Sequence, residues 1–422
     1  MLLVLFLFLM IIGVPIAVSL GISTVFALLL FTDIPLSLIS QSMYSSMNSF
    51  IMVAVPLFIL AGMIMDEGGI AERIFNFAKS LVGWLTGGLG HVSIVANVIF
   101  AGMAGSSVAE VASIGNISIK AMTKNKYPQE YATALSLASS MLATIIPPSI
   151  LMVIAASVAN VSIGKALIGG LIPGVIIAAL FMAFNYVYSR KKGYGERIKF
   201  SFGELRSSFI QAIPALLVPV ILLGGILSGY FTPTESAAVA VLYSLAISLF
   251  LYKTIKLRQL PRLFFQTAKV TGTILFIAVT AKPAGLIFEM DGLPSRVGSF
   301  IGSLSDQPIV IMLLLLVFYI LVGMFMDATA AIFILVPILL PTVTGLGIDP
   351  VFFIVFTVII LSFGLITPPV GVCLYAACNI TGLSLEKVTR SAVPWMAVTI
   401  LIMIIFAIFP GVITGPISWF GL

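Results

Sequence analysis

The feature that most constrains the fold is a series of apolar blocks separated by short polar segments. A helix needs roughly 20 apolar residues to cross a bilayer, and the blocks are of this order. They lie at about 2–31, 50–66, 92–119, 130–157, 166–188, 213–231, 234–252, 270–290, 308–345, 351–379 and 391–413. Only 9% of the 422 residues are charged, against about 25% in a soluble domain. The sequence therefore predicts an all-α polytopic membrane protein.

The basic residues lie in short segments between the blocks, where they act as topology signals rather than as a nucleic-acid surface. We place the N-terminus in the cytoplasm as a retained first span, since it lacks a basic leader and a small-residue cleavage site. If 92–119 is a hairpin that enters and returns on one side, 18 of the 21 Lys and Arg fall on the cytoplasmic side. Lys165 and Arg296 fall outside, and Lys282 stays within a span.

The chain also matches itself at a shift of 221 residues. Gly102-Met103 aligns with Gly323-Met324, Pro147-Pro148 with Pro368-Pro369, and Pro173 with Pro394. Just upstream, residues 61–74 match 284–297 at a shift of 223. Four matches in the same order indicate an internal repeat, and we predict repeats over 1–200 and 201–422.

The charge map gives the two copies opposite orientations. The hairpin 92–119 opens to the cytoplasm and the hairpin 308–345 opens to the outside. The helix 130–157 runs outward, whereas 351–379 runs inward. Inverted repeats of this kind are typical of secondary transporters, which bind their ligands near the midplane at discontinuous helices.

Each repeat has a Pro-Pro pair that must break its helix, because proline lacks an N–H and clashes with the preceding turn. Pro147-Pro148 frees the carbonyls of Ala143 and Thr144, and Pro368-Pro369 frees those of Gly364 and Leu365. Unpaired carbonyls in hydrocarbon need protein, water or an ion, and the half-helix that follows offers a positive dipole end to an anion. A simple kink satisfied by neighbours is the alternative.

The two hairpin tips carry oxygen ligands at matching positions, with Ser106 equivalent to Asp327. Glycines allow the backbone to come close, and sets of oxygen ligands suit hard cations such as Na⁺. An acid within the membrane is a functional candidate by default, although the serines could simply cap helices. The candidate cation ligands are Gly105, Ser106, Ser107, Ala143, Thr144, Pro147, Gly323, Asp327, Thr329, Gly364 and Thr367.

Other polar residues are less informative. Ser149, Asn160 and Asn379 are candidates for substrate contact, although turn formation explains the asparagines equally well. Thr232 and Glu235 form the pattern of a capping box. The chain has no GxxxxGK[ST] phosphate loop, and its single histidine and two cysteines offer no convincing transition-metal site. We expect no cofactor other than a coupling ion.

Several strings resemble the large membrane subunit of tripartite ATP-independent periplasmic (TRAP) transporters. They are GMAGSSVAEVASIG, IIPPSI, FTPTESAAVAV, GMFMDATAAIFILVPILLP and GLITPPVG. The resemblance implies an elevator mechanism, with one scaffold and one transport domain, in the bacterial inner membrane. It also implies Na⁺ coupling, a small four-helix membrane subunit, and a periplasmic substrate-binding protein that delivers an organic acid. Carried over by position, one Na⁺ site involves Ser106, Ser107 and the 143–148 break, and the other Asp327 and the 364–369 break.

Two residues depart from the family pattern. The first hairpin has Glu110 where the family usually has Asp, and Lys282 stands where a neutral residue is expected. Two other functions remain open at this point. One is a stand-alone Na⁺-coupled anion transporter, and the other is an intramembrane enzyme that uses Ser106 or Asp327.

Overall fold

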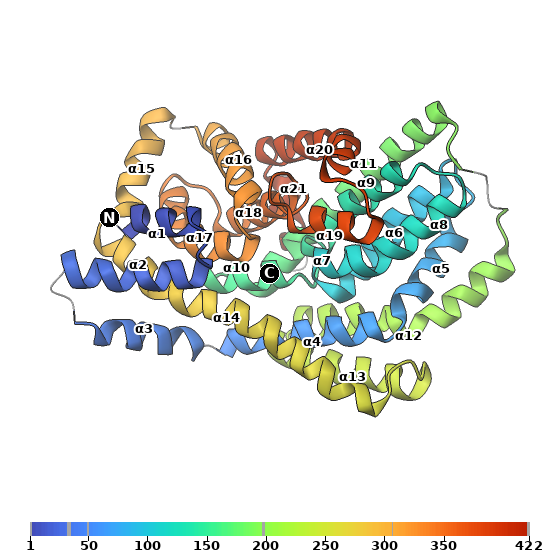
Figure 1. The fold of residues 1–422 in the computed structure, drawn as a ribbon, viewed down its shortest axis with the longest axis horizontal. Coiled ribbons are helices and arrows are strands. Elements are labelled where there is room, and N and C mark those ends of the chain that lie inside the picture. Colours follow the sequence, from blue (N-terminus) through green and yellow to red (C-terminus); the bar gives the residue numbers. More distant parts are fainter. Residues whose placement is uncertain (1, 32–34, 49, 196–198, 306, 420–422) are drawn as a thin grey trace.

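The computed structural model describes residues 2–31, 35–48, 50–195, 199–305 and 307–419, and within these ranges it contains helices and no strand (Figure 1). In this part of the chain, seven helices are long and apolar enough to cross a membrane, or eight if one bent pair counts as a single span. The prediction of an all-α, multi-pass membrane protein is confirmed.

In its described residues, the first half of the chain forms eleven α-helices. They are α1 (Leu2–Ile11), α2 (Ile16–Phe31), α3 (Ser37–Met47), α4 (Ala54–Glu67), α5 (Ile70–Val82), α6 (Gly88–Ala104), α7 (Ser107–Glu110), α8 (Asn116–Lys124), α9 (Gln129–Ser140), α10 (Ile150–Val158) and α11 (Ile163–Lys192). A π-helical segment joins α7 to α8, and a 3-10 turn follows α9.

The second half repeats much of this order. Its helices are α12 (Phe202–Leu227), α13 (Pro233–Ala246), α14 (Leu260–Met290), α15 (Leu293–Leu304), α16 (Pro308–Phe325), α17 (Ala328–Gly345), α18 (Pro350–Gly364), α19 (Val372–Thr381), α20 (Leu385–Ile408) and α21 (Gly411–Trp419). Helix α7 begins at residue 107 and α17 at 328, the same shift of 221 found in the sequence. Gly69 before α5 and Gly292 before α15 both adopt φ near +70°, at 67° and 69°.

Three predicted spans differ from the observed helices. The block 2–31 is not one span, because Gly13 (φ 88°) and Pro15 separate α1 from α2, and the two helices pack on each other. The block at 50–66 gives a 14-residue α4, which bends by 69° into α5. Helix α14 begins at residue 260 rather than 270 and has 31 residues, so Lys269 lies inside it rather than in a loop.

The chain turns within both of the blocks that the sequence predicts to be hairpins. Helices α6 and α7 meet at Gly105-Ser106, and α16 and α17 meet at Met326-Asp327. Helix α6 also packs against α8, so the chain does fold back in the first hairpin. Both α16 and α17 have 18 residues, which is long enough to cross. The second hairpin is therefore built from two helices that each have the length of a span.

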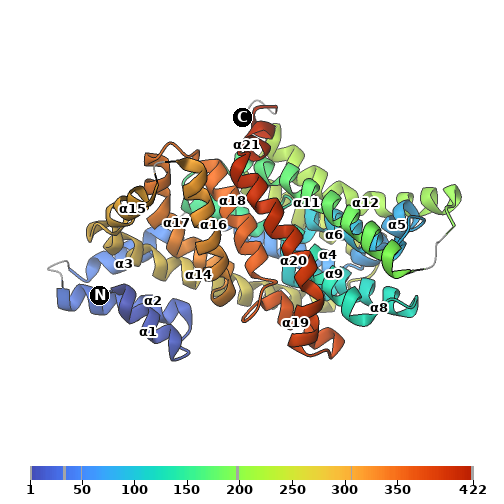
Figure 2. The same ribbon diagram turned by 90° about the horizontal axis from the view of Figure 1, so that it is seen from above.

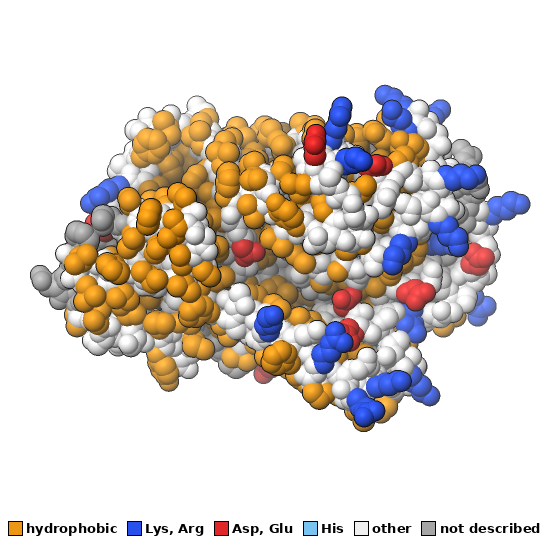
Figure 3. Space-filling view, viewed as in Figure 1, with side chains coloured by type: hydrophobic (Ala, Val, Ile, Leu, Met, Phe, Trp, Pro, Cys, Tyr) orange, Lys and Arg blue, Asp and Glu red, His pale blue; other side chains and the backbone are white. Residues whose placement is uncertain are grey.

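The two broken helices lie at the centre of the molecule. Residues Tyr131–Ser140 of α9 and Val351–Gly364 of α18 are all buried. Helix α18 packs against α16, α17, α10 and α11. Around this inner group, α14 runs along one side and contacts α2, α3, α4 and α17, while α13 covers α4 and α12 (Figures 1 and 2). The face shown in Figure 3 is mostly hydrophobic over α1 and α2, and its charged side chains gather towards the opposite end.

Candidate functional site

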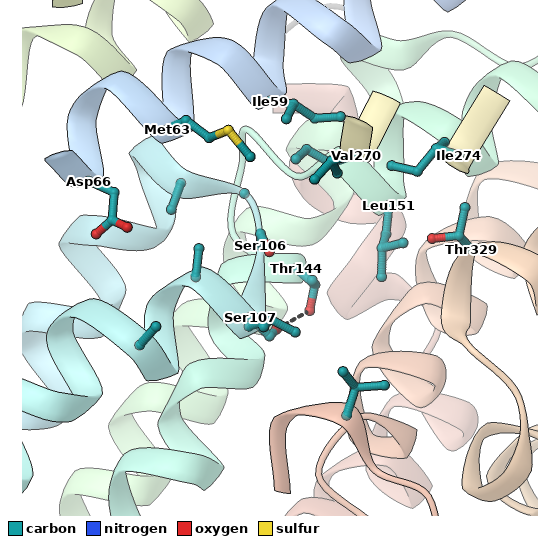
Figure 4. A pocket seen from close by; sticks show the side chains of 18 of the residues that line it. Ile59, Met63, Asp66, Ser106, Ser107, Thr144, Leu151, Val270, Ile274 and Thr329 are labelled. Atoms are coloured by element: carbon teal, nitrogen blue, oxygen red, sulfur yellow. Dashed lines mark hydrogen bonds between the residues drawn. The ribbon is translucent and has the colours of Figure 1, made fainter. Parts of the chain in front are cut away.

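A cavity of about 610 Å³ lies where both hairpin tips and both helix breaks meet α4 and α14. Its polar lining comes from Asp66, Glu67, Ser106, Ser107, Thr144, Gln266, Lys269, Asp327 and Thr329. Figure 4 shows Ser106, Ser107 and Thr144 on one side, with Thr329 across the cavity beyond Leu151. The fold thus brings together polar groups that are more than 200 residues apart in the sequence.

Each hairpin tip is joined to the break of its own repeat by one backbone hydrogen bond. The Ile150 amide donates to the Gly105 carbonyl at 3.4 Å, and the Val370 amide donates to the Met324 carbonyl at 3.1 Å. Both donors lie just after a Pro-Pro pair, and both acceptors lie at a tip. A backbone contact of a similar kind therefore joins tip and break in each half, although its residues are not equivalent at the shift of 221.

The first tip carries a short chain of hydroxyl groups. The Ser107 and Thr144 hydroxyls lie 3.1 Å apart, and the Thr144 hydroxyl is 2.7 Å from that of Ser362. All three side chains are buried. Because Ser362 belongs to α18, this chain connects the first tip and the first break to the broken helix of the second half.

The second tip carries a charge. The Asp327 side chain is half-buried and caps α17 by accepting a hydrogen bond from the Thr329 amide at 2.9 Å. Ser106 occupies the equivalent N-cap position of α7, but its side chain makes no capping hydrogen bond. Asp327 therefore has a structural role as a cap, while the remaining acceptor sites of its carboxylate are available to the cavity.

Three of the four carbonyls freed at the breaks find a donor within the protein, as the alternative of a kink satisfied by neighbours expects. The Ser149 hydroxyl donates to the Thr144 carbonyl, the Thr367 amide to Gly364, and the Cys373 amide to Leu365. These donors take the place of the amides that the prolines lack. A carbonyl has two lone pairs, so each retains an acceptor site. Both Pro-Pro peptide bonds are cis.

Two glycine positions require the absence of a side chain. A Cβ on Gly364 would lie 2.7 Å from the Gly323 Cα, because α16 and α18 cross there in backbone contact. A Cβ on Gly105 would lie 2.8 Å from the Pro148 carbonyl oxygen, and Gly105 has φ +60°. Gly105, Gly323 and Gly364 thus let the tips approach the helix breaks closely.

The predicted ligand candidates divide into two groups. Gly105, Ser106, Ser107, Thr144, Asp327 and Thr329 line the cavity. Ala143, Pro147, Gly323, Gly364 and Thr367 do not line it and support the breaks and crossings behind it.

The three substrate candidates lie outside the cavity lining. Ser149 is buried and caps α10, Asn160 is exposed in a turn with φ 52°, and Asn379 is exposed on α19. Turn and cap formation account for Ser149 and Asn160 without a ligand. The geometry gives none of the three a contact with the cavity.

Sequence reasoning missed four polar residues of the cavity: Asp66, Glu67, Gln266 and Lys269. Asp66 and Glu67 fall inside the repeated segment 61–74, which was a usable signal. The apolar block begins only after Lys269, so hydropathy predicts a loop where the structure has α14. Glu110 is also notable, since it is fully buried, and in the described part of the chain its carboxyl oxygens lie beside the Ala143 backbone without a hydrogen bond of full geometry.

Two smaller predictions concern capping and metals. The capping box is confirmed, because the Glu235 carboxylate accepts from the Thr232 amide at 2.7 Å and the Glu235 amide donates to the Thr232 hydroxyl at 3.2 Å. In the described ranges, no group of three or more His, Cys, Asp or Glu residues is placed to hold a metal ion.

A multi-pass bundle with two broken helices and two hairpin tips facing one cavity defines a membrane transporter. The family model of the "Tripartite ATP-independent periplasmic transporter, DctM component" matches residues 3–412. The chain belongs to this family, which is a family of transporter permeases and not of enzymes.

Related proteins with established names belong to the same class of transporter. The chain is 37% identical over 412 residues to the sialic acid TRAP transporter permease protein SiaT of Haemophilus influenzae, covering 98% of this chain and 67% of that protein. It is 36% identical to the sialic acid TRAP transporter large permease protein SiaM of Vibrio cholerae, covering 94% and 93%. It is also 36% identical to the C4-dicarboxylate TRAP transporter large permease protein DctM of Pseudomonas aeruginosa, covering 96% and 95%.

Among solved structures, the Alcanivorax borkumensis YdaH transporter has a similar fold. The TM-score is 0.63 at 15% sequence identity, and the match covers 89% of both chains. At this identity the likeness concerns the fold alone.

Proposed function

We propose that this chain carries out Na⁺-coupled uptake of an organic acid anion across the bacterial inner membrane. The solute would be delivered by a periplasmic substrate-binding protein, and a small four-helix membrane subunit would complete the transporter. The names of the relatives, which concern sialic acid and C4-dicarboxylates, support this class of solute. The observation that carries the proposal is the single cavity shared by both tips and both breaks.

In this proposal, each tip binds one Na⁺ together with its own break. The first site uses the Ser106 and Ser107 hydroxyls and the backbone near Thr144. The second uses the Asp327 carboxylate and Thr329. Carbonyls and helix ends at unwound segments are common Na⁺ ligands in secondary transporters. Hydroxyl oxygens and one carboxylate fit a hard monovalent cation better than a transition metal.

We further propose an elevator mechanism with inverted repeats over 1–200 and 201–422. The outer helices α12 to α14, with α4, would form the scaffold. The hairpins and broken helices would form the transport domain, since they pack together at the centre. The cavity between the two groups is where a moving domain would carry its solute past a fixed one.

The experiment is uptake into proteoliposomes that contain this chain, the small subunit and the binding protein encoded with them. An inward Na⁺ gradient should drive accumulation of labelled sialic acid or succinate without ATP. Equal uptake with K⁺ in place of Na⁺ would contradict Na⁺ coupling. Uptake of free solute without the binding protein would instead indicate a stand-alone transporter.

Topology is tested with two single cysteines at equivalent hairpin ends, in a background with Cys373 and Cys378 replaced by Ala. Asn125 and Thr344 are both exposed and lie at the bases of α8 and α17. With the N-terminus in the cytoplasm, Asn125→Cys should react only from the cytoplasmic side and Thr344→Cys only from the periplasm. Labelling of both from one side would contradict the inverted arrangement.

A further inference from the structure

We propose that Lys269 binds the carboxylate of the transported acid in the cavity between α14 and the hairpin tips. This inference rests on the proposed function and assigns one of its missing parts, a group that recognises the negative charge of the solute.

Lys269 lies on the face of α14 that borders the cavity. Leu263, Gln266, Val270 and Ile274 line the same cavity, and with Lys269 they follow the spacing of one helical stripe. A second cavity of about 850 Å³ continues along α14 towards α2. Five residues line both spaces: Lys269, Val270, Ile274, Asp327 and Thr329. Lys269 and Asp327 therefore border the same continuous space.

The charges of the cavity make Lys269 distinctive. Its described lining contains three carboxylates, on Asp66, Glu67 and Asp327, and a single cationic side chain, that of Lys269. An acid anion entering such a space meets net repulsion unless a cation accompanies it. Na⁺ at the tips supplies mobile positive charge, and Lys269 supplies the fixed one.

Lys269 is also free to take a ligand. Within the described ranges, Lys269 forms no ion pair. The ion pair that is present there joins Arg296 to Asp291 at 3.8 Å. Asp327 is engaged as a helix cap and not by Lys269. A lysine and an acid that border one cavity without pairing leave both charges available, one for a carboxylate and the other for Na⁺.

The same helix provides a matched comparison. Lys282 is also exposed on α14, but it lines neither cavity. The two lysines are 13 positions apart in the sequence, so their side chains leave the helix in widely different directions. Snorkelling to the membrane interface explains Lys282 fully, whereas it does not explain why Lys269 borders the space between the tips.

The test combines uptake and binding on the complete transporter, with labelled sialic acid and succinate as probes. Lys269→Gln should raise the KM for the transported acid about tenfold, the effect expected for losing one charge-assisted contact. Lys269→Arg should restore most of the affinity, and Lys282→Gln should match the wild type. Thermal unfolding of the purified chain gives a second readout: Lys269→Gln should keep the stabilisation by Na⁺ alone and lose the further stabilisation by acid.

The outcomes separate this inference from the proposed function. If the wild type shows Na⁺-driven uptake and Lys269→Gln has an unchanged KM, Lys269 does not bind the solute, while the transport function stands. If Lys269→Gln loses the Na⁺ stabilisation as well, its role is structural and the inference is wrong. If the wild type shows no Na⁺-driven uptake of any acid tested, the proposed function itself fails.

Discussion

The two hairpin tips have similar backbone arrangements but differ in the charge of their side chains. In each half, a carbonyl at the tip accepts a hydrogen bond from an amide one or two residues after the Pro-Pro pair, so tip and break are joined in a similar way. The first tip then presents only hydroxyls, in the buried chain from Ser107 through Thr144 to Ser362. The second presents the carboxylate of Asp327, half-buried at the cavity. Backbone geometry is thus common to both halves, and the side chains set how strongly each can attract a cation.

The largest expected effect concerns the charged tip. Asp327→Asn keeps a side chain that caps a helix well, so it removes the charge and leaves the fold. A charged ligand contributes about 2–3 kcal/mol, so half-saturating Na⁺ for uptake should rise roughly 30- to 150-fold. Unchanged Na⁺ dependence would make Asp327 a cap and nothing more, and the two tips would then be functionally alike.

The next prediction concerns the crossing behind the second tip. Gly364→Ala would place a methyl group 2.7 Å from the Gly323 Cα, and overpacking of this kind costs about 1–3 kcal/mol. In the first repeat the equivalent position is already Ala143, which is buried without conflict. The thermal unfolding temperature in detergent should fall for Gly364→Ala. Gly345→Ala is the control, because no atom lies within 4 Å of its added methyl.

The hydroxyl chain of the first tip should give a smaller change in transport. Thr144→Val keeps the shape and leaves the Ser107 and Ser362 hydroxyls without their shared partner. A loss of about 1–2 kcal/mol corresponds to roughly a 5- to 30-fold rise in half-saturating Na⁺. Thr144→Ser should remain close to the wild type. If Thr144→Val had the same half-saturating Na⁺ as the wild type, the three linked hydroxyls would serve only to pack α18 against the first tip.

The smallest effect belongs to Ser106, the counterpart of Asp327. Its side chain makes no capping bond, so Ser106→Ala removes one neutral ligand of the proposed Na⁺ site and leaves the cap unchanged. We expect a change of about 0.5–1 kcal/mol, or roughly 2- to 5-fold in half-saturating Na⁺. If Ser106→Ala raised half-saturating Na⁺ as much as Asp327→Asn, the second tip would not bind Na⁺ more strongly through its charge, and the proposed difference between the two sites would be wrong.

The sequence predicted the parts of the fold that depend on local chemistry. The Pro-Pro pairs forced breaks in α9–α10 and α18–α19, and the Gly-rich tips fell where the hairpins turn. The capping box at Thr232 was also correct. These features follow from missing amides, glycine dihedrals and side chains that act within three residues of their own position.

The composition of the cavity could not be predicted in the same way. Lys269 lies in α14 more than 50 residues from either tip, and only tertiary packing places it beside them. The start of α14 was also predicted wrongly, at residue 270 rather than 260. Hydropathy detects apolar side chains, and the first turns of this helix are more polar than the rest. The partners of the freed carbonyls were missed for a similar reason, since Ser149 and Cys373 act as donors only once the breaks have folded.

Equilibrium binding of ²²Na⁺ to the purified chain tests the proposed Na⁺ binding at the tips most directly. The wild type should bind Na⁺ saturably, in competition with unlabelled Na⁺ but not with K⁺. Asp327→Asn should bind less Na⁺ per chain under the same conditions, with Lys282→Gln as the matched control. Absence of saturable binding to the wild type, or equal binding to Asp327→Asn, would contradict the assignment of a cation site at the second tip.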